Sequence, residues 1–263
     1  MSGGSSVSRS LLAVLLVAAV GLLILPWQAR LQAIAKREGF HAVVLGVDLR
    51  ERVGQSGFLA ALSGFRAPVA ALLWIEAHGA WEKTEWGRMA SLFNTVTTLQ
   101  PHTLLYWDIA AWHMAWNASA AALQNTKLQG EALRERARRQ YIRLGRDFLE
   151  RGIVNNPDSY LLHERLGILL RDKEEDHAAA ADEFAKAAAL PGAPSYLKRF
   201  VAYETAKVPE RAREAYRMFR ELYEEGGMMR TPAVLARLRG MESRLGIPDG
   251  ERVTAAPASS PRP

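Results

Sequence analysis

Apolar residues recur at three- and four-residue spacings from about residue 59 to residue 246. The stretch LAALSGFRAPVAALLWIEAHGAW, residues 59–81, is a clear example. This spacing places the apolar side chains on one face of a helix, whereas the alternation that marks β-strands is nearly absent. The pattern therefore predicts an all-α protein, which the abundance of alanine also favours.

The chain begins with a different pattern. Residues 11–27 read LLAVLLVAAVGLLILPW, an apolar run of 17 residues without a charge. Such a run is near the lower limit for a membrane-spanning helix and longer than the usual core of a signal peptide. It predicts a tail and a transmembrane or signal-anchor helix over residues 1–27. Cleavage at the small-residue site Ala33-Ile34-Ala35 stays an alternative.

Two segments flank the helical region. Residues 28–58 contain a short apolar patch, HAVVLGVDL, followed by a polar stretch with glycines, and we interpret them as a juxtamembrane connector. Residues 247–263 are rich in Pro, Ser and Ala and hold too little apolar surface to form a core. We expect this tail to be disordered, so that the helical domain covers residues 59–246.

Prolines divide the helical region into units. Pro157, in NNPDSYLLHERLG, is followed 34 residues later by Pro191, in LPGAPSYLKRF. Between them, residues typical of the tetratricopeptide (TPR) pattern lie at nearly the right spacings. These residues are Leu166, Gly167, Leu170, Ala180, Phe184 and Ala187. The match requires one extra residue, which we place in a loop around RDKEEDH.

The other units are less regular. The first is expected to hold ALLWIEAHGAW and Phe93, and the fourth SYLKRFVAYETAK and ERAREAYRMFRELYEE, followed by a terminal helix in RTPAVLARLRGMESRLG. In the second unit, residues 117–136 look like an insertion between helices at 103–116 and 138–154. Small residues such as Ala77 and Ala111 let paired helices approach closely. The fold prediction is a TPR-like α-solenoid of about four helix pairs.

The similarity goes further than the generic repeat. The apolar N-terminal run, SGFRAPVAALLWIEA, TTLQPHTLLYWDIAAW, NNPDSYLLHERLGILL and AAALPGAPSYLKRF together resemble a group of bacterial membrane-anchored TPR proteins. The resemblance covers roughly residues 58–225. It implies architecture and carries no established activity. The segment 117–136 departs from the group, which puts a shared partner site near it in doubt.

TPR solenoids usually bind a protein segment on the concave face formed by the first helix of each pair. The residues one, five and eight positions after the bulky residue of that helix are expected to point there. The predicted partner-binding residues are Trp74, His78, Trp81, Asp108, Trp112, Glu164, Arg171 and Lys198, with Ala115, Ile168, Ala202 and Thr205 in the remaining positions. Tryptophans at helical spacings equally fit an inter-repeat core, and this alternative stays open.

The charge and the candidate catalytic or metal-binding residues do not change this prediction. The net charge is +6, but Arg and Lys alternate with Glu along helices, which is typical of solvated faces and does not favour nucleic acid. Absent cysteine excludes disulfides and thiol catalysis. The six histidines form no HExxH motif, and no phosphate-binding or nucleophile motif occurs. We therefore expect no metal, cofactor, small-molecule substrate or catalysis.

The functional prediction is a non-catalytic, membrane-tethered scaffold for protein–protein interaction, in a setting such as envelope, pilus or secretion-complex assembly. The alternative is a fixed accessory subunit of a larger membrane complex. Residues 11–27 would hold the chain in the inner membrane as a single pass. The flanking charges are nearly balanced, but a short N-terminal tail usually stays inside, which favours a solenoid outside the cytoplasm.

Overall fold

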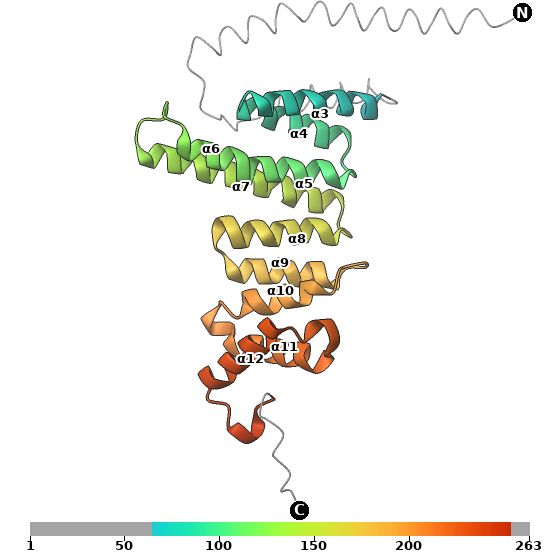
Figure 1. The fold of residues 1–263 in the computed structure, drawn as a ribbon. Helices are drawn as coiled ribbons and strands as arrows, with labels where there is room; N and C mark the ends of the chain where they lie inside the picture. Colours follow the sequence, from blue (N-terminus) through green and yellow to red (C-terminus); the bar gives the residue numbers. More distant parts are fainter. Residues whose placement is uncertain (1–64, 254–263) are drawn as a thin grey trace, which may run out of the picture. The chain divides into compact units, whose positions relative to one another are not determined.

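The computed structural model describes residues 65–253, and these residues are helical without a strand (Figure 1). The predicted anchor at 1–27 and connector at 28–58 lie outside them. The α-helices are α3 (Arg66–Glu82), α4 (Trp86–Leu99), α5 (Leu104–Trp112), α6 (Ser119–Gln124), α7 (Glu131–Asn155), α8 (Tyr160–Leu169), α9 (His177–Ala189), α10 (Tyr196–Thr205), α11 (Ala212–Glu225) and α12 (Pro232–Arg244). Two π-helical segments, η1 (His113–Ala118) and η2 (Leu170–Glu174), and three short 3₁₀ turns, η3 (Pro209–Arg211), η4 (Gly227–Met229) and η5 (Asp249–Glu251), complete them. No helix in this part of the chain is long and apolar enough to cross a membrane.

Helices pack mainly on their neighbours along the chain. Helix α3 packs on α4, α9 packs on both α8 and α10, and α11 packs on α10 and α12. Successive helices run back and forth across the described part of the chain (Figure 1). Helices lie at each place where the sequence pattern predicts one, which confirms the all-α fold.

Prolines mark the helix ends as the sequence predicts. Helices α4, α7 and α9 each end two residues before a proline, at Pro101, Pro157 and Pro191 respectively. The turn at Pro101 is also a hydrogen-bonding site, because its carbonyl accepts from Trp107 Nε1 at 2.8 Å and from Asn156 Nδ2 at 2.9 Å. The indole and the amide therefore tie the end of α4 to α5 and to the end of α7.

The buried side chains form two clusters. The larger runs from Ala77 to Val201 and contains the fully buried rings of Phe93, Phe148 and Phe184. The smaller belongs to the C-terminal helices, around Phe219. Half-buried Met218 packs against both clusters.

Close helix approach depends on glycine at two positions. A Cβ on Gly167 would lie 2.7 Å from the Phe184 ring, which confirms its predicted role between α8 and α9. A Cβ on Gly145 would lie 2.7 Å from the Cβ of Ala115 and 2.8 Å from the carbonyl oxygen of Ala111. The sequence analysis did not single out Gly145, which brings α7 against α5 and η1.

The insertion predicted at 117–136 is mostly helix rather than a loop. Helix α5 continues through η1 into α6, which ends at Gln124, and α7 begins at Glu131. Only residues 125–130 form a turn. The added residues therefore lengthen both helices of the second pair.

The stretch RDKEEDH, where a loop with one extra residue was expected, begins inside a helix and contains the end of that helix. Residues Leu170–Glu174 form the π-helical segment η2, in which each turn holds one residue more than an α-helical turn. Glu175 then adopts a left-handed conformation, with φ at 55°, and ends the helix. The expected loop is therefore present, because residues 175 and 176 separate η2 from α9.

The tail boundary predicted at residue 247 is too early. Ile247 N donates to the Glu242 carbonyl oxygen at 2.9 Å, and Val253 N donates to Glu242 Oε1 at 2.8 Å. Glu242 is buried, and these bonds fold residues 247–253 back onto α12. Residues 254–263 of the predicted tail lie outside the described part.

Candidate functional site

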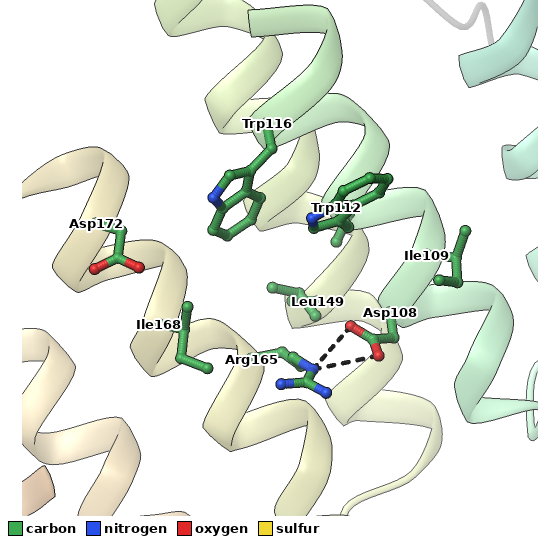
Figure 2. Close-up of a pocket in the computed structure, with 9 residues that line it drawn as sticks. Asp108, Ile109, Trp112, Trp116, Leu149, Arg165, Ile168 and Asp172 are labelled. Carbon is green, nitrogen blue, oxygen red and sulfur yellow. Dashed lines mark hydrogen bonds and ion pairs between the residues drawn. The ribbon is translucent and has the colours of Figure 1, made fainter. Parts of the chain in front are cut away.

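A groove of about 480 Å³ is formed by residues that lie between 108 and 172 in the chain. Its walls are α5 with η1 on one side and α8 with η2 on the other, and α7 lies beneath (Figure 2). The lining residues are Asp108, Ile109, Ala111, Trp112, Trp116, Leu149, Arg165, Ile168 and Asp172.

Two tryptophans dominate one wall of this groove. Trp112 is 46% exposed, which is a large fraction for this side chain, and Trp116 is half buried. The Lys173 ammonium lies 5.1 Å from the centre of the Trp116 ring, within range of a cation–π contact. Figure 2 shows both indoles facing the groove, with Ile168 on the opposite wall. The walls are therefore apolar and aromatic.

The charged groups of the groove are paired. Arg165 Nε lies 3.1 Å from Asp108 Oδ1, so an ion pair joins the two walls at one end (Figure 2). At the other end, Asp172 accepts from Arg171 at 2.6 and 3.1 Å. Each carboxylate is thus balanced by an arginine. The groove carries no net charge from these four residues.

A second depression of about 570 Å³ lies between the α3–α4 turn and η1 with α6. Two tryptophans and three uncharged polar side chains contribute to its surface. The lining residues are Trp81, Glu82, Thr84, Trp86, Asn117, Ala120, Ala121 and Gln124.

His113 connects the two depressions. Its ring centre lies 5.5 Å from that of Trp81 and 5.0 Å from that of Trp112, so the two indoles are no more than about 10 Å apart. Asn117 Nδ2 donates to His113 Nδ1 at 3.0 Å. Burial, and then the nearby His78, lower the pKa of His113 to about 4, because both disfavour its charged form. The imidazole is therefore neutral at pH 7.

The structure brings only part of the predicted surface together. Trp81, Asp108 and Trp112 line the depressions, as does Ile168. Trp74 instead packs against Phe93 and Tyr106, with ring centres 5.2 and 4.9 Å away. The tryptophans thus divide between the alternatives: some belong to the packed interior and others face the grooves.

Other residues that were predicted to bind a partner also belong to the packed interior. His78 Nδ1 lies 2.9 Å from the Trp74 carbonyl oxygen, one helical turn earlier. The nearby Trp107 is only 3% exposed. In the second pair, Ala115 is fully buried. These residues support the wall of the depressions and do not line them.

Apart from Ile168, the predicted residues of α8, η2 and α10 line neither depression. Glu164 was expected on the concave face, but it is buried and accepts a 2.7 Å hydrogen bond from the Tyr196 hydroxyl. The Arg171 guanidinium packs over the rings of Phe184 and Phe200. Lys198 pairs with Glu225 at 3.0 Å, and Ala202 and Thr205 are fully buried.

The lining residues that sequence reasoning missed include Trp86, Trp116, Arg165 and Asp172. Trp116 had a detectable signal, because it follows Trp112 by four residues and so lies on the same helical face. Arg165 had no signal in the sequence, because its ion pair with Asp108 depends on how α5 and α8 pack. Among the described residues, no three potential ligands gather in a way that could hold a metal ion.

Comparison with protein-family models, curated proteins and solved structures found no match to this chain.

Proposed function

We propose that this chain is a membrane-tethered scaffold for protein–protein interaction, built as a TPR-like solenoid of about four helix pairs. In this arrangement α3, α5 with η1 and α6, α8 with η2, and α10 are the first helices of the pairs. The close approach at Gly167 and the proline-limited helix ends support the repeat. The apolar run at 11–27 supplies the tether, with a single pass through the inner membrane and the solenoid outside the cytoplasm.

The observation that carries the proposal is the exposure of Trp112 in a formed groove. A tryptophan that is 46% exposed beside Trp116 and Ile168 offers apolar area that a partner can cover. Tryptophans in such positions often dominate the binding energy of an interface. The groove and the second depression fit an extended protein segment with apolar side chains.

Two further features favour this surface. Both walls of the groove include a π-helical segment, and such segments occur frequently at functional sites. Both carboxylates that line the groove are paired with arginines, and the Lys173 ammonium lies over Trp116, which gives an acidic segment no carboxylate to repel it and a basic segment no free carboxylate to bind. The role we propose is non-catalytic.

The test is affinity purification from membranes with the full-length chain. Trp112→Ala should reduce the amount of captured partner about tenfold or more, since loss of a central tryptophan commonly costs about 2 kcal/mol. Leu105→Ala is the matched control, because Leu105 lies on the same helix, is 55% exposed and does not line the groove. Both variants should keep wild-type helicity and melting temperature.

Two results would contradict the proposal. Equal capture by Trp112→Ala and Leu105→Ala would show that the groove does not bind the partner. A large loss of stability in Trp112→Ala alone would assign this side chain to the core. Circular dichroism on the same samples separates the two.

A second candidate, the fixed accessory subunit, is favoured by the outer face of α3. Phe65, just before this helix, and Leu72 and Ile75 within it are each 67% exposed. A helix with apolar residues on all sides is normally covered. A permanent partner on this face would co-purify with the chain stoichiometrically, even in high salt. The double variant Leu72→Gln/Ile75→Gln should no longer capture this partner, whereas Trp112→Ala should still capture it.

A further inference from the structure

The lengthened helices of the second pair form a hairpin. Helix α6, the turn at 125–130 and the first half of α7 make up this α6–α7 hairpin, residues 119–143. Helix α7 has 25 residues and so a length of about 37 Å, whereas the ten residues of α8 span about 15 Å. The hairpin consequently extends past its neighbouring helices (Figure 1).

The hairpin is strongly basic. Residues 125–143 contain six Lys or Arg and two Glu. Arg138 and Arg139 share Glu135, at 2.7 and 3.5 Å. Arg136 and Arg143 are exposed, and neither pairs with an acidic side chain in the part of the chain that the structure describes. Their charge is available to an anionic surface.

Two leucines are exposed beside the turn of the hairpin. Leu123, near the end of α6, is 45% exposed, and Leu133, near the start of α7, is 49% exposed. Arg136 and Arg143 follow Leu133 by three and ten residues, so that the leucine and both arginines lie on one side of the helix. Apolar side chains at a tip with cations behind them suit the interface of a lipid bilayer, where each group finds its own environment.

We propose that the α6–α7 hairpin docks onto anionic phospholipid headgroups, with Leu123 and Leu133 entering the interface. The inference takes from the proposed function only that the tether keeps the domain beside a bilayer. A bilayer interface offers anionic headgroups and an apolar layer next to each other, as the arginines and the leucines together require. Each arginine near an anionic surface strengthens binding about fivefold, so reversing two of them should abolish docking.

The absence of cysteine permits a site-specific test on the full-length chain. An environment-sensitive fluorophore on Gln129→Cys, in the exposed turn, reports contact between hairpin and lipid. In vesicles containing phosphatidylglycerol its emission should shift to the blue, and in phosphatidylcholine vesicles it should not. Arg136→Glu/Arg143→Glu should remove the shift, whereas the matched Arg237→Glu/Arg239→Glu on α12 should keep it.

Equal emission in the two lipids, or a shift that survives Arg136→Glu/Arg143→Glu, would overturn the inference. Flotation with phosphatidylcholine vesicles tests the tether separately. Should the chain fail to float there, flotation with phosphatidylglycerol vesicles becomes the readout of the hairpin. If the wild type floats with these vesicles and Arg136→Glu/Arg143→Glu does not, the result supports docking. If the wild type stays at the bottom of the gradient, the result refutes docking.

Discussion

Protonation of His113 should destabilise the fold well above the pH at which most carboxylates titrate. Burial lowers the pKa of this histidine from 6.5 to about 4 in the folded chain, while the unfolded chain keeps the ordinary value. The unfolded state therefore binds more protons between these two pH values. Stability contributed by neutral His113 is fully present above pH 6.5 and is lost as the pH falls towards 4.

The magnitude follows from the same two values. A shift of this size corresponds to about 3 kcal/mol when the loss is complete, and to about 2 kcal/mol at pH 5. Typical domains have a stability of about 5–15 kcal/mol, so the loss should be measurable. The ring also holds Trp81 and Trp112 in place, and its protonation should loosen both depressions.

The assay is urea unfolding of the full-length chain, followed by circular dichroism between pH 7.5 and 4.5. His113→Phe keeps an aromatic ring and removes the titration, although it gives up the hydrogen bond to Asn117. Its free energy of unfolding should therefore change less with pH than that of the wild type, by about 2 kcal/mol at pH 5. Identical pH profiles for the two proteins would refute the assignment.

Two further substitutions test the packing and the buried hydrogen bond. Gly167→Ala should destabilise the chain by about 1–3 kcal/mol, because its Cβ would overlap the Phe184 ring; Gly240→Ala, with open space around its Cβ, should be neutral or stabilising in the same thermal melts. Tyr196→Phe should cost about 1–3 kcal/mol by leaving the buried Glu164 carboxylate without its hydroxyl donor, and denaturant unfolding that gives wild-type stability would contradict this.

Helix positions could be predicted because their signals are local. Proline and the small residues act within one turn of their own positions, so the ends of α4, α7 and α9 and the contact at Gly167 follow from the sequence. The two π-helical segments have no comparable signal. Both lie inside longer helical stretches, η1 between α5 and α6 and η2 at the end of α8.

The candidate surface was less predictable than the helices. Trp74 and Trp112 were both predicted to lie on the concave face, yet one packs against Phe93 and the other is 46% exposed. The difference depends on which neighbouring side chains each helix meets, and sequence spacing does not specify these contacts. Glu164 shows the same limit, since its burial depends on Tyr196 from the next pair.

The separation of the buried side chains into two clusters has a mechanical consequence. Because the rings of Phe93, Phe148 and Phe184 belong to the larger cluster, we expect α11 and α12 to detach first, with the loss of the Met218 contact to that cluster. Under a pulling force the chain should then lengthen in steps, with the C-terminal helices yielding first. Such a domain could extend at its C-terminal end under load while the tryptophan-lined grooves stay folded.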